Sequence, residues 1–198
     1  MISKNLTKKD ETRREIIKNT RDILSKMGYK KSSTEEIAKS LNKTKSALYH
    51  YFENREEIVK AVLHYEGDQL KHALSEAISR EDDPQKKLQI FFIIRAKQIY
   101  KLWNFYKSII EEYFLRYSYI MLALDDYTRY EQAMVESILK EGITRGVFRI
   151  SDISLTSRTM IKMIKGFDFF MFQGEKFKEI QNELSEALHV FINGISKH

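Results

Sequence analysis

Residues 33–63 read STEEIAKSLNKTKSALYHYFENREEIVKAVL, and they hold the clearest helix and turn signals of the chain. Ser33 and Glu36, three residues apart, form a capping box, which predicts that a helix begins at Ser33. That helix is short, because Asn42 follows closely and Asn tolerates the left-handed conformation that a tight turn requires. Thr44 predicts the cap of another helix, since its hydroxyl can accept from the free N–H groups of a first turn. The stretch therefore predicts two short helices joined by a tight turn.

A longer helix is predicted in front of these two. Apolar or small residues recur at helical spacing on one face of it: Ile16, Ile17, Thr20, Ile23, Leu24 and Met27. Gly28 then supplies the left-handed residue that commonly follows a helix. A longer helix followed by two short helices and a tight turn is the helix-turn-helix arrangement.

The third of these helices has two different faces. At about 100° per residue, four polar or aromatic residues fall within one arc of about 140°: Lys45, Ser46, Tyr49 and His50. The opposite arc holds the residues expected in the core: Ala47, Leu48, Tyr51 and Phe52. A cation, a hydroxyl, a phenol and an imidazole suit phosphate oxygens and base edges, and the start of a helix adds partial positive charge. The polar face is therefore predicted to read the major groove of DNA.

The charge of the chain is concentrated in the same region. Residues 1–63 carry 15 Lys and Arg against 9 Asp and Glu, a net charge of +6, whereas residues 64–198 carry 19 of each. A localised positive field attracts polyanions, although a solvated basic surface gives the same count. Nucleic acid is therefore the partner that the charge favours.

Other classes of protein find little support in the sequence. There is no cysteine, which excludes disulfides and cysteine-based metal sites and fits a reducing cytoplasm. No apolar run approaches the length that crosses a membrane, and no signal-peptide pattern opens the chain. No phosphate loop, nucleophile elbow or metal motif is found. We expect a cytoplasmic protein without catalytic residues, metal or cofactor, and without a membrane partner.

Residues from about Arg13 to Leu63 resemble the DNA-binding domain of TetR-type transcriptional regulators. The resemblance rests on MGY at 27–29, TEEIAKSL at 34–41, TKSALYHYF at 44–52 and NREEIVKAVL at 54–63. It implies an all-α chain, with a helix-turn-helix DNA-binding domain at residues 1–63. Residues 64–198 would form a helical domain that binds a ligand and dimerises.

Carried over residue by residue, the resemblance implies DNA contacts from eight positions: Thr34, Lys43, Thr44, Lys45, Ser46, Tyr49, His50 and Arg55. Thr34 would touch phosphate, and so would Arg55, at a position where the family usually has lysine. Asn42, Lys43 and Ser46 depart from the usual glycine, apolar residue and glycine. Because two of these departures change the surface offered to DNA, the operator sequence is expected to differ from those of relatives.

The middle of the chain is rich in aromatic residues. Residues 91–130 hold 12 of the 24 Phe, Tyr and Trp residues, and a helical core is the plainest explanation. Eight of the 12 have a polar atom that needs a partner when buried, which also suits the wall of a ligand pocket. The predicted ligand-binding residues are Arg95, Trp103, Tyr106, Tyr113, Phe114 and Tyr117. Arg95 is expected either at the surface, with its charged end in water, or facing an acidic group of the ligand.

Two apolar stripes near the carboxyl end predict a helix hairpin. They are either buried inside their own domain or, as the resemblance implies, packed against a second copy in a four-helix dimer interface. The predicted interface residues are Met160, Met163, Ile164, Phe167, Phe177, Leu184, Leu188 and Phe191.

These patterns together predict a homodimeric regulator that binds an inverted-repeat operator in double-stranded DNA, since a two-fold dimer presents two reading helices in symmetric positions. It is expected to be a repressor that an unknown, largely apolar small molecule releases from DNA. Two alternatives remain. One is a DNA-binding regulator with no small-molecule inducer; the other is a helical ligand carrier or enzyme whose basic amino end is incidental.

Overall fold

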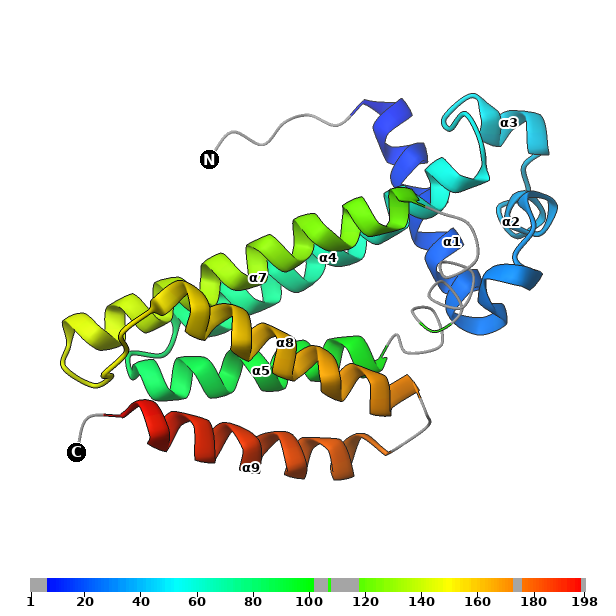
Figure 1. Cartoon of the computed structure of the whole chain (residues 1–198). Helices are drawn as coiled ribbons and strands as arrows, with labels where there is room; N and C mark the ends of the chain where they lie inside the picture. Colours follow the sequence, from blue (N-terminus) through cyan, green and yellow to red (C-terminus); the bar gives the residue numbers. More distant parts are fainter. Residues whose placement is uncertain (1–6, 102–106, 108–117, 173–175, 197–198) are drawn as a thin grey trace. The chain divides into compact units, whose positions relative to one another are not determined.

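The computed structural model describes residues 7–101, 107, 118–172 and 176–196, and these residues are almost entirely helical (Figure 1). The elements are α1 (Lys8–Lys31), α2 (Thr34–Ser40), α3 (Lys45–Tyr49), α4 (Arg55–Ser79), α5 (Pro84–Lys101), α7 (Ser118–Thr144), α8 (Ile153–Phe172) and α9 (Phe177–Ile195). The predicted all-α class is confirmed. None of the described helices combines the length and the apolar character that a membrane crossing needs.

The described residues divide into two compact units. One contains residues 7–67, 107 and 118–123, and the other contains residues 68–101, 124–172 and 176–196. The helix α4 passes from the first unit to the second after Gly67, close to the predicted domain boundary at residues 63 and 64. Each unit has its own core, and each is described by itself below.

Local hydrogen bonds set where the helices of the first unit begin. The N-caps of α2 and α3 are Ser33 and Thr44, whose side chains accept from the backbone N–H groups of Glu36 and Ala47 at 3.2 and 3.1 Å. Thr7 caps α1 in the same way through Asp10. The predicted starts of α2 and α3 are thereby confirmed.

Both residues that the sequence predicts to be left-handed, Asn42 and Gly28, have positive φ. Asn42, in the turn between α2 and α3, has φ of 51°, in the left-handed region that Asn tolerates. Gly28 has φ of 74° and interrupts α1, after which one more short helical turn reaches Lys31. The helix therefore kinks at this glycine and does not end there.

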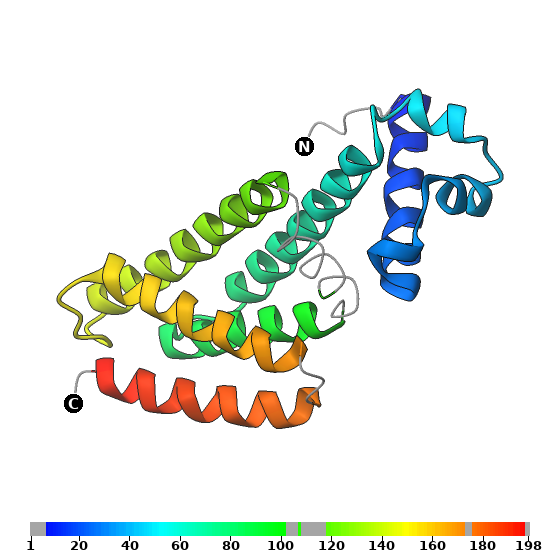
Figure 2. The same cartoon turned by 45° about the vertical axis from the view of Figure 1, so that its right-hand side comes forward.

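The core of the first unit lies between α1, α2, α3 and the first half of α4 (Figure 2). Its fully buried side chains include Ile16, Leu24, Ile37, Leu48, Ile58 and Val62. A partly buried ion pair adds to this packing. The Glu66 side chain on α4 is 0% exposed and lies 2.8 Å from Nε of Arg21 on α1, whose side chain is 29% exposed. Apolar burial and this pair fasten the first half of α4 to the helix-turn-helix.

The second unit is a helical bundle in which α5 packs against both α8 and α9, and α8 packs against α9 (Figure 1). Its core includes Leu88, Phe91, Phe92, Val135, Leu139, Met160, Ile164, Leu184 and Leu188. The rings of Phe91 and Phe92 meet edge to face, with centroids 5.0 Å apart. At one end of the bundle, Lys87 on α5 pairs with Glu141 on α7 at 2.7 Å.

The predicted dimer-interface stripe needs correction. Four of its members are buried inside their own chain: Met160 and Ile164 on α8 are 0% exposed, and Leu184 and Leu188 on α9 are 0% and 1% exposed. A side chain that the same chain already covers has no surface to offer a second copy. Met163, Phe167, Phe177 and Phe191 are half-buried.

The outward sides of these two helices carry other apolar residues. Leu155 on α8 is 53% exposed and Val190 on α9 is 62% exposed. Cβ atoms added at Gly166 on α8 and Gly194 on α9 would meet nothing within 4 Å. The outward sides of α8 and α9 thus remain open in the single chain, whereas the buried half of the predicted stripe residues belongs to its core.

Candidate nucleic-acid interface

The helix α3 exposes the predicted polar face and buries the opposite one. The exposed side chains are Lys45, Ser46, Tyr49 and His50, with Tyr49 41% exposed. On the other side, Leu48 is 0% and Phe52 is 2% exposed, and Tyr51 is half-buried. Tyr49 is one of the few large apolar or aromatic side chains of the described residues that are this exposed. The predicted division of α3 into two faces is therefore confirmed, and its role in binding DNA stays a prediction.

The two lysines beside this face already have acidic partners. Nζ of Lys45 lies 2.6 Å from Oε1 of Glu35 on α2, and Nζ of Lys43 lies 3.9 Å from Oε2 of Glu15 on α1. The hydrogen bond from Lys45 lowers the pKa of Glu35, and the same bond raises the pKa of Lys45. Sequence reasoning missed Glu35, because its partner lies on a different helix.

Arg55 has a structural role that the sequence did not suggest. Its Nη2 donates to the backbone carbonyl of Tyr29, and its guanidinium lies 3.9 Å above the centre of the Tyr29 ring. Tyr29 is only 4% exposed, and Arg55 is half-buried. Arg55 thus fastens the start of α4 to the end of α1. A phosphate contact would have to come from the part of the guanidinium that stays exposed.

Thr34 differs from the other predicted contact residues because it is buried. It is the first residue of α2, and it is 5% exposed. The remaining members are exposed or half-buried, with Thr44 and Ser46 in the first group and Lys43 in the second. The side chain of Thr34 has little surface with which to meet a phosphate, so any contact at this helix start falls mainly to its backbone.

In the second unit, the environment of Arg95 contradicts its predicted position at the surface. Arg95 is 3% exposed. Its Nη1 and Nη2 donate to the two carboxylate oxygens of Asp168 on α8, each at 2.8 Å, and its Nε donates to Oε1 of Glu131 on α7. Burial alone would lower the pKa of Arg95, but the charges of Asp168 and Glu131 outweigh it and hold that pKa well above the ordinary value.

This ion network also changes the expectation for a ligand. Arg95 already bonds to two carboxylates, and Lys165 on α8 adds a second positive charge close to them. An acidic ligand group approaching Arg95 would have to displace one of them. Trp103, Tyr106, Tyr113, Phe114 and Tyr117 lie outside the described residues, so their predicted roles stay predictions. Among the residues that are described, no group of three or more His, Asp and Glu side chains is arranged to hold a metal ion.

Comparison with known families gives two matches along the chain. Residues 16–62 match the family described as "Bacterial regulatory proteins, tetR family". Residues 92–197, more than half of the chain, match the family described as "QacR-like protein, C-terminal region". The two matches correspond to the helix-turn-helix and to most of the second unit.

Individual relatives agree along most of their length. The chain is 22% identical over 190 residues to the HTH-type transcriptional regulator QacR of Staphylococcus aureus, covering 92% of this chain and 97% of QacR. A solved TetR transcription regulator from Haloarcula marismortui has a TM-score of 0.83 at 16% identity, covering 94% of this chain and 99% of its own. A TetR-family regulator from Cytophaga hutchinsonii has a TM-score of 0.81 at 22% identity, covering 98% and 100%. At these identities, the solved structures establish a shared fold.

Proposed function

Because this chain belongs to the tetR family of bacterial regulatory proteins, it is a DNA-binding transcriptional regulator, and we propose that it is a dimeric repressor released from an inverted-repeat operator by a largely apolar small molecule. The observation that carries the DNA-binding part is the exposure of the polar face of α3, while Leu48 and Phe52 on the opposite side are buried. A cytoplasmic location is part of this proposal, because a regulator of this kind has to reach the chromosome.

The chemistry of the α3 face supports contact with DNA. Lys45 and Ser46 lie in the first turn of α3, where a reading helix meets base edges and where its free N–H groups favour phosphate. Tyr49 and His50 follow on the same exposed side. The excess of positive charge in residues 1–63 supplies the long-range attraction.

Two substitutions, one on the exposed face of α3 and one in the buried residues just after it, test this assignment. Tyr49→Ala is expected to weaken operator binding by about 1–3 kcal/mol and to leave the fold intact, because the ring is exposed. Phe52→Ala is expected to lower the free energy of unfolding by about 3–5 kcal/mol, because it empties a buried site. Fluorescence anisotropy with a labelled duplex measures the first effect, and urea unfolding measures the second. Loss of stability in Tyr49→Ala with unchanged affinity would mean that the two faces are assigned the wrong way round.

The dimer is proposed to form through the outward sides of α8 and α9. Leu155 and Val190 provide apolar side chains there, and Gly166 and Gly194 leave room for a close approach of another helix. A two-fold contact between such surfaces places two copies of α3 in symmetric positions, which is why the operator should be an inverted repeat.

The proposed ligand is largely apolar because residues 91–130 are so rich in rings. No acidic ligand group is expected beside Arg95, since Asp168 and Glu131 already satisfy that guanidinium. A ligand can induce release only if it prefers the conformation that does not fit the operator; equal affinity for both conformations would shift nothing.

Emission from Trp103, the sole tryptophan, offers a direct test of the inducer. Apolar compounds that change this emission are titrated with and without operator duplex. Linkage requires that any factor by which the ligand lowers operator affinity is matched by the factor by which the operator lowers ligand affinity. We expect weaker ligand binding in the presence of the operator. Identical ligand affinities in the two titrations would favour the regulator without a small-molecule inducer.

The two alternatives predict different results with DNA. A regulator without an inducer still binds a duplex from the region around its own gene, whereas a helical carrier or enzyme does not. The relatives described above are regulators of transcription, not enzymes. A gel-shift experiment at low salt separates these classes, and failure to bind any such duplex would count against both regulatory functions.

A further inference from the structure

Glu35 is an acidic residue on a surface that has to meet a polyanion. It lies in the first turn of α2, and its Oε1 is 2.6 Å from Nζ of Lys45, the first residue of α3. Both side chains are exposed, at 61% for Glu35 and 49% for Lys45. The ammonium that stands at the start of the reading helix is therefore held by a carboxylate from the neighbouring helix.

Stability does not account for this pair. Exposed ion pairs contribute little to folding, because water screens the charges and two long side chains lose freedom. Helices α2 and α3 are already joined by apolar packing that includes Ile37 and Leu48, both 0% exposed. An acidic residue in the first turn of α2 also interacts favourably with the helix dipole, but Glu36 provides the same charge one position later. What distinguishes Glu35 is its bond to Lys45.

The pair changes what Lys45 can gain from a phosphate. Non-specific binding to DNA comes mainly from lysines and arginines that release condensed counterions when they neutralise phosphates. If Lys45 left Glu35 for a phosphate, it would exchange one anionic partner for another. It would also leave the Glu35 carboxylate unpaired beside the DNA backbone. Both effects disfavour the use of Lys45 in a non-specific complex.

A base edge makes different demands on the same ammonium. An ammonium has three N–H donors, and the bond to Glu35 occupies one of them. Guanine presents two acceptors in the major groove, and the first residues of a reading helix are the ones that reach base edges. Lys45 can therefore donate to a base while it stays bonded to Glu35.

We propose that Glu35 is a specificity-determining residue of the DNA interface, which keeps Lys45 away from phosphates in non-specific complexes and directs its remaining donors to a base in the operator. This inference rests on the proposed function, since it needs a protein that reads DNA. It assigns a positioning role to an acidic residue that does not itself have to touch the DNA.

The test compares Glu35→Gln with Glu36→Gln in the full chain. Both substitutions remove one negative charge from exposed positions in the same turn of α2. Two probes are used: a duplex of random sequence, and a duplex that the wild-type protein selects from a random pool. Affinities are measured by anisotropy over a range of salt concentrations, and circular dichroism confirms that both variants are folded.

Glu35→Gln is expected to raise the affinity for the random duplex by about five- to tenfold at 0.1 M salt. It should also steepen the slope of log K against log salt by about 0.9, which is the effect of one additional phosphate contact. Its affinity for the selected duplex should stay the same or fall, so discrimination between the probes decreases. Glu36→Gln should change both affinities by similar factors and preserve discrimination.

The dependence on Lys45 is tested in a second background. In Lys45→Gln, adding Glu35→Gln should no longer raise the affinity for the random duplex. Equal effects of Glu35→Gln and Glu36→Gln, or an effect that persists without Lys45, would overturn this inference. The proposed function as a DNA-binding regulator would remain valid in either case. If the wild-type protein selects no duplex at all, the proposed function fails, and the inference fails with it.

Discussion

Arg95→Met is expected to lower the free energy of unfolding by about 3–5 kcal/mol, because it leaves buried carboxylates without their cation. Glu131 is 0% exposed and Asp168 is 14% exposed, and Arg95 is the residue that joins them. The methionine fills much of the same space, so the loss reflects charge rather than a cavity. Urea unfolding of the second unit, followed by circular dichroism, measures the effect.

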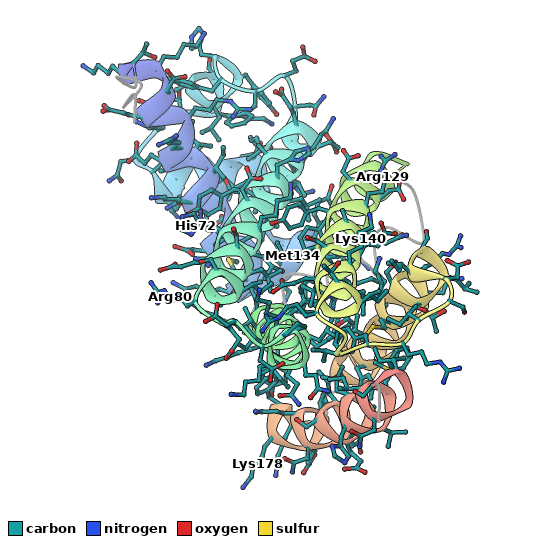
Figure 3. All side chains as sticks on the ribbon, turned by 90° about the vertical axis from the view of Figure 1, so that its left-hand side faces the viewer. His72, Arg80, Arg129, Met134, Lys140 and Lys178 are labelled. Atoms are coloured by element: carbon teal, nitrogen blue, oxygen red, sulfur yellow. The ribbon has the colours of Figure 1, made fainter. Side chains whose placement is uncertain are left out.

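Arg129→Met is the matched control for this experiment. Arg129 lies on α7 (Figure 3) and also bonds to acidic residues, Asp125 and Asp126, but its side chain is 67% exposed. Exposed pairs contribute about 0–1 kcal/mol, so the control should change stability little. Adding Glu131→Gln and Asp168→Asn to Arg95→Met should recover part of the lost stability, since both carboxylates are then neutral. The recovery should be incomplete, because Lys165 on α8 interacts with both carboxylates and loses them. A loss no greater in Arg95→Met than in Arg129→Met would show that the buried network does not hold α5, α7 and α8 together.

Charge placed on the two sides of α9 is expected to give two different outcomes. Leu188→Glu puts a carboxylate into a site that is 1% exposed, and the chain should unfold or lose several kcal/mol of stability. Val190→Glu puts the same group at a position that is 62% exposed, so the chain should stay folded and dissociate into monomers. Sedimentation velocity reports the assembly state, and circular dichroism reports the fold.

The comparison has its own control in Ala133→Glu, which adds a carboxylate to an exposed position on α7. This variant should remain a folded dimer. Monomers of Val190→Glu should also bind an inverted-repeat duplex weakly, because one copy reaches one half-site only. A folded Val190→Glu that stays dimeric would place the interface somewhere other than the outward side of α9.

Several features of the first unit follow from the sequence because their causes are local. Ser33 and Thr44 each need only an N–H group three residues away to cap a helix. Asn42 and Gly28 adopt positive φ because their own side chains, or the lack of one, permit it. The two faces of α3 follow from helical periodicity alone. For these elements, sequence neighbours supply nearly all the relevant physics.

Burial partners are a different matter, because periodicity marks a face as apolar without saying what covers it. The stripes that include Met160 and Leu188 predict buried residues, and these residues are buried. Residues covered by the same chain and residues covered by a second copy show the same pattern in the sequence. Only the packing of α5 against α8 and α9 decides that these particular residues belong to the core of one chain.

Four features could be derived from the sequence: the all-helical class, the helix-turn-helix, the polar face of α3 and the concentration of positive charge in residues 1–63. The partners of the charged residues depend on how the helices pack. Glu131 and Asp168 lie 36 and 73 positions from Arg95, and Glu35 lies 10 positions from Lys45 on another helix. The reason is that Coulomb attraction and burial depend on distance in space, and the distance between residues on different helices is set by how those helices pack.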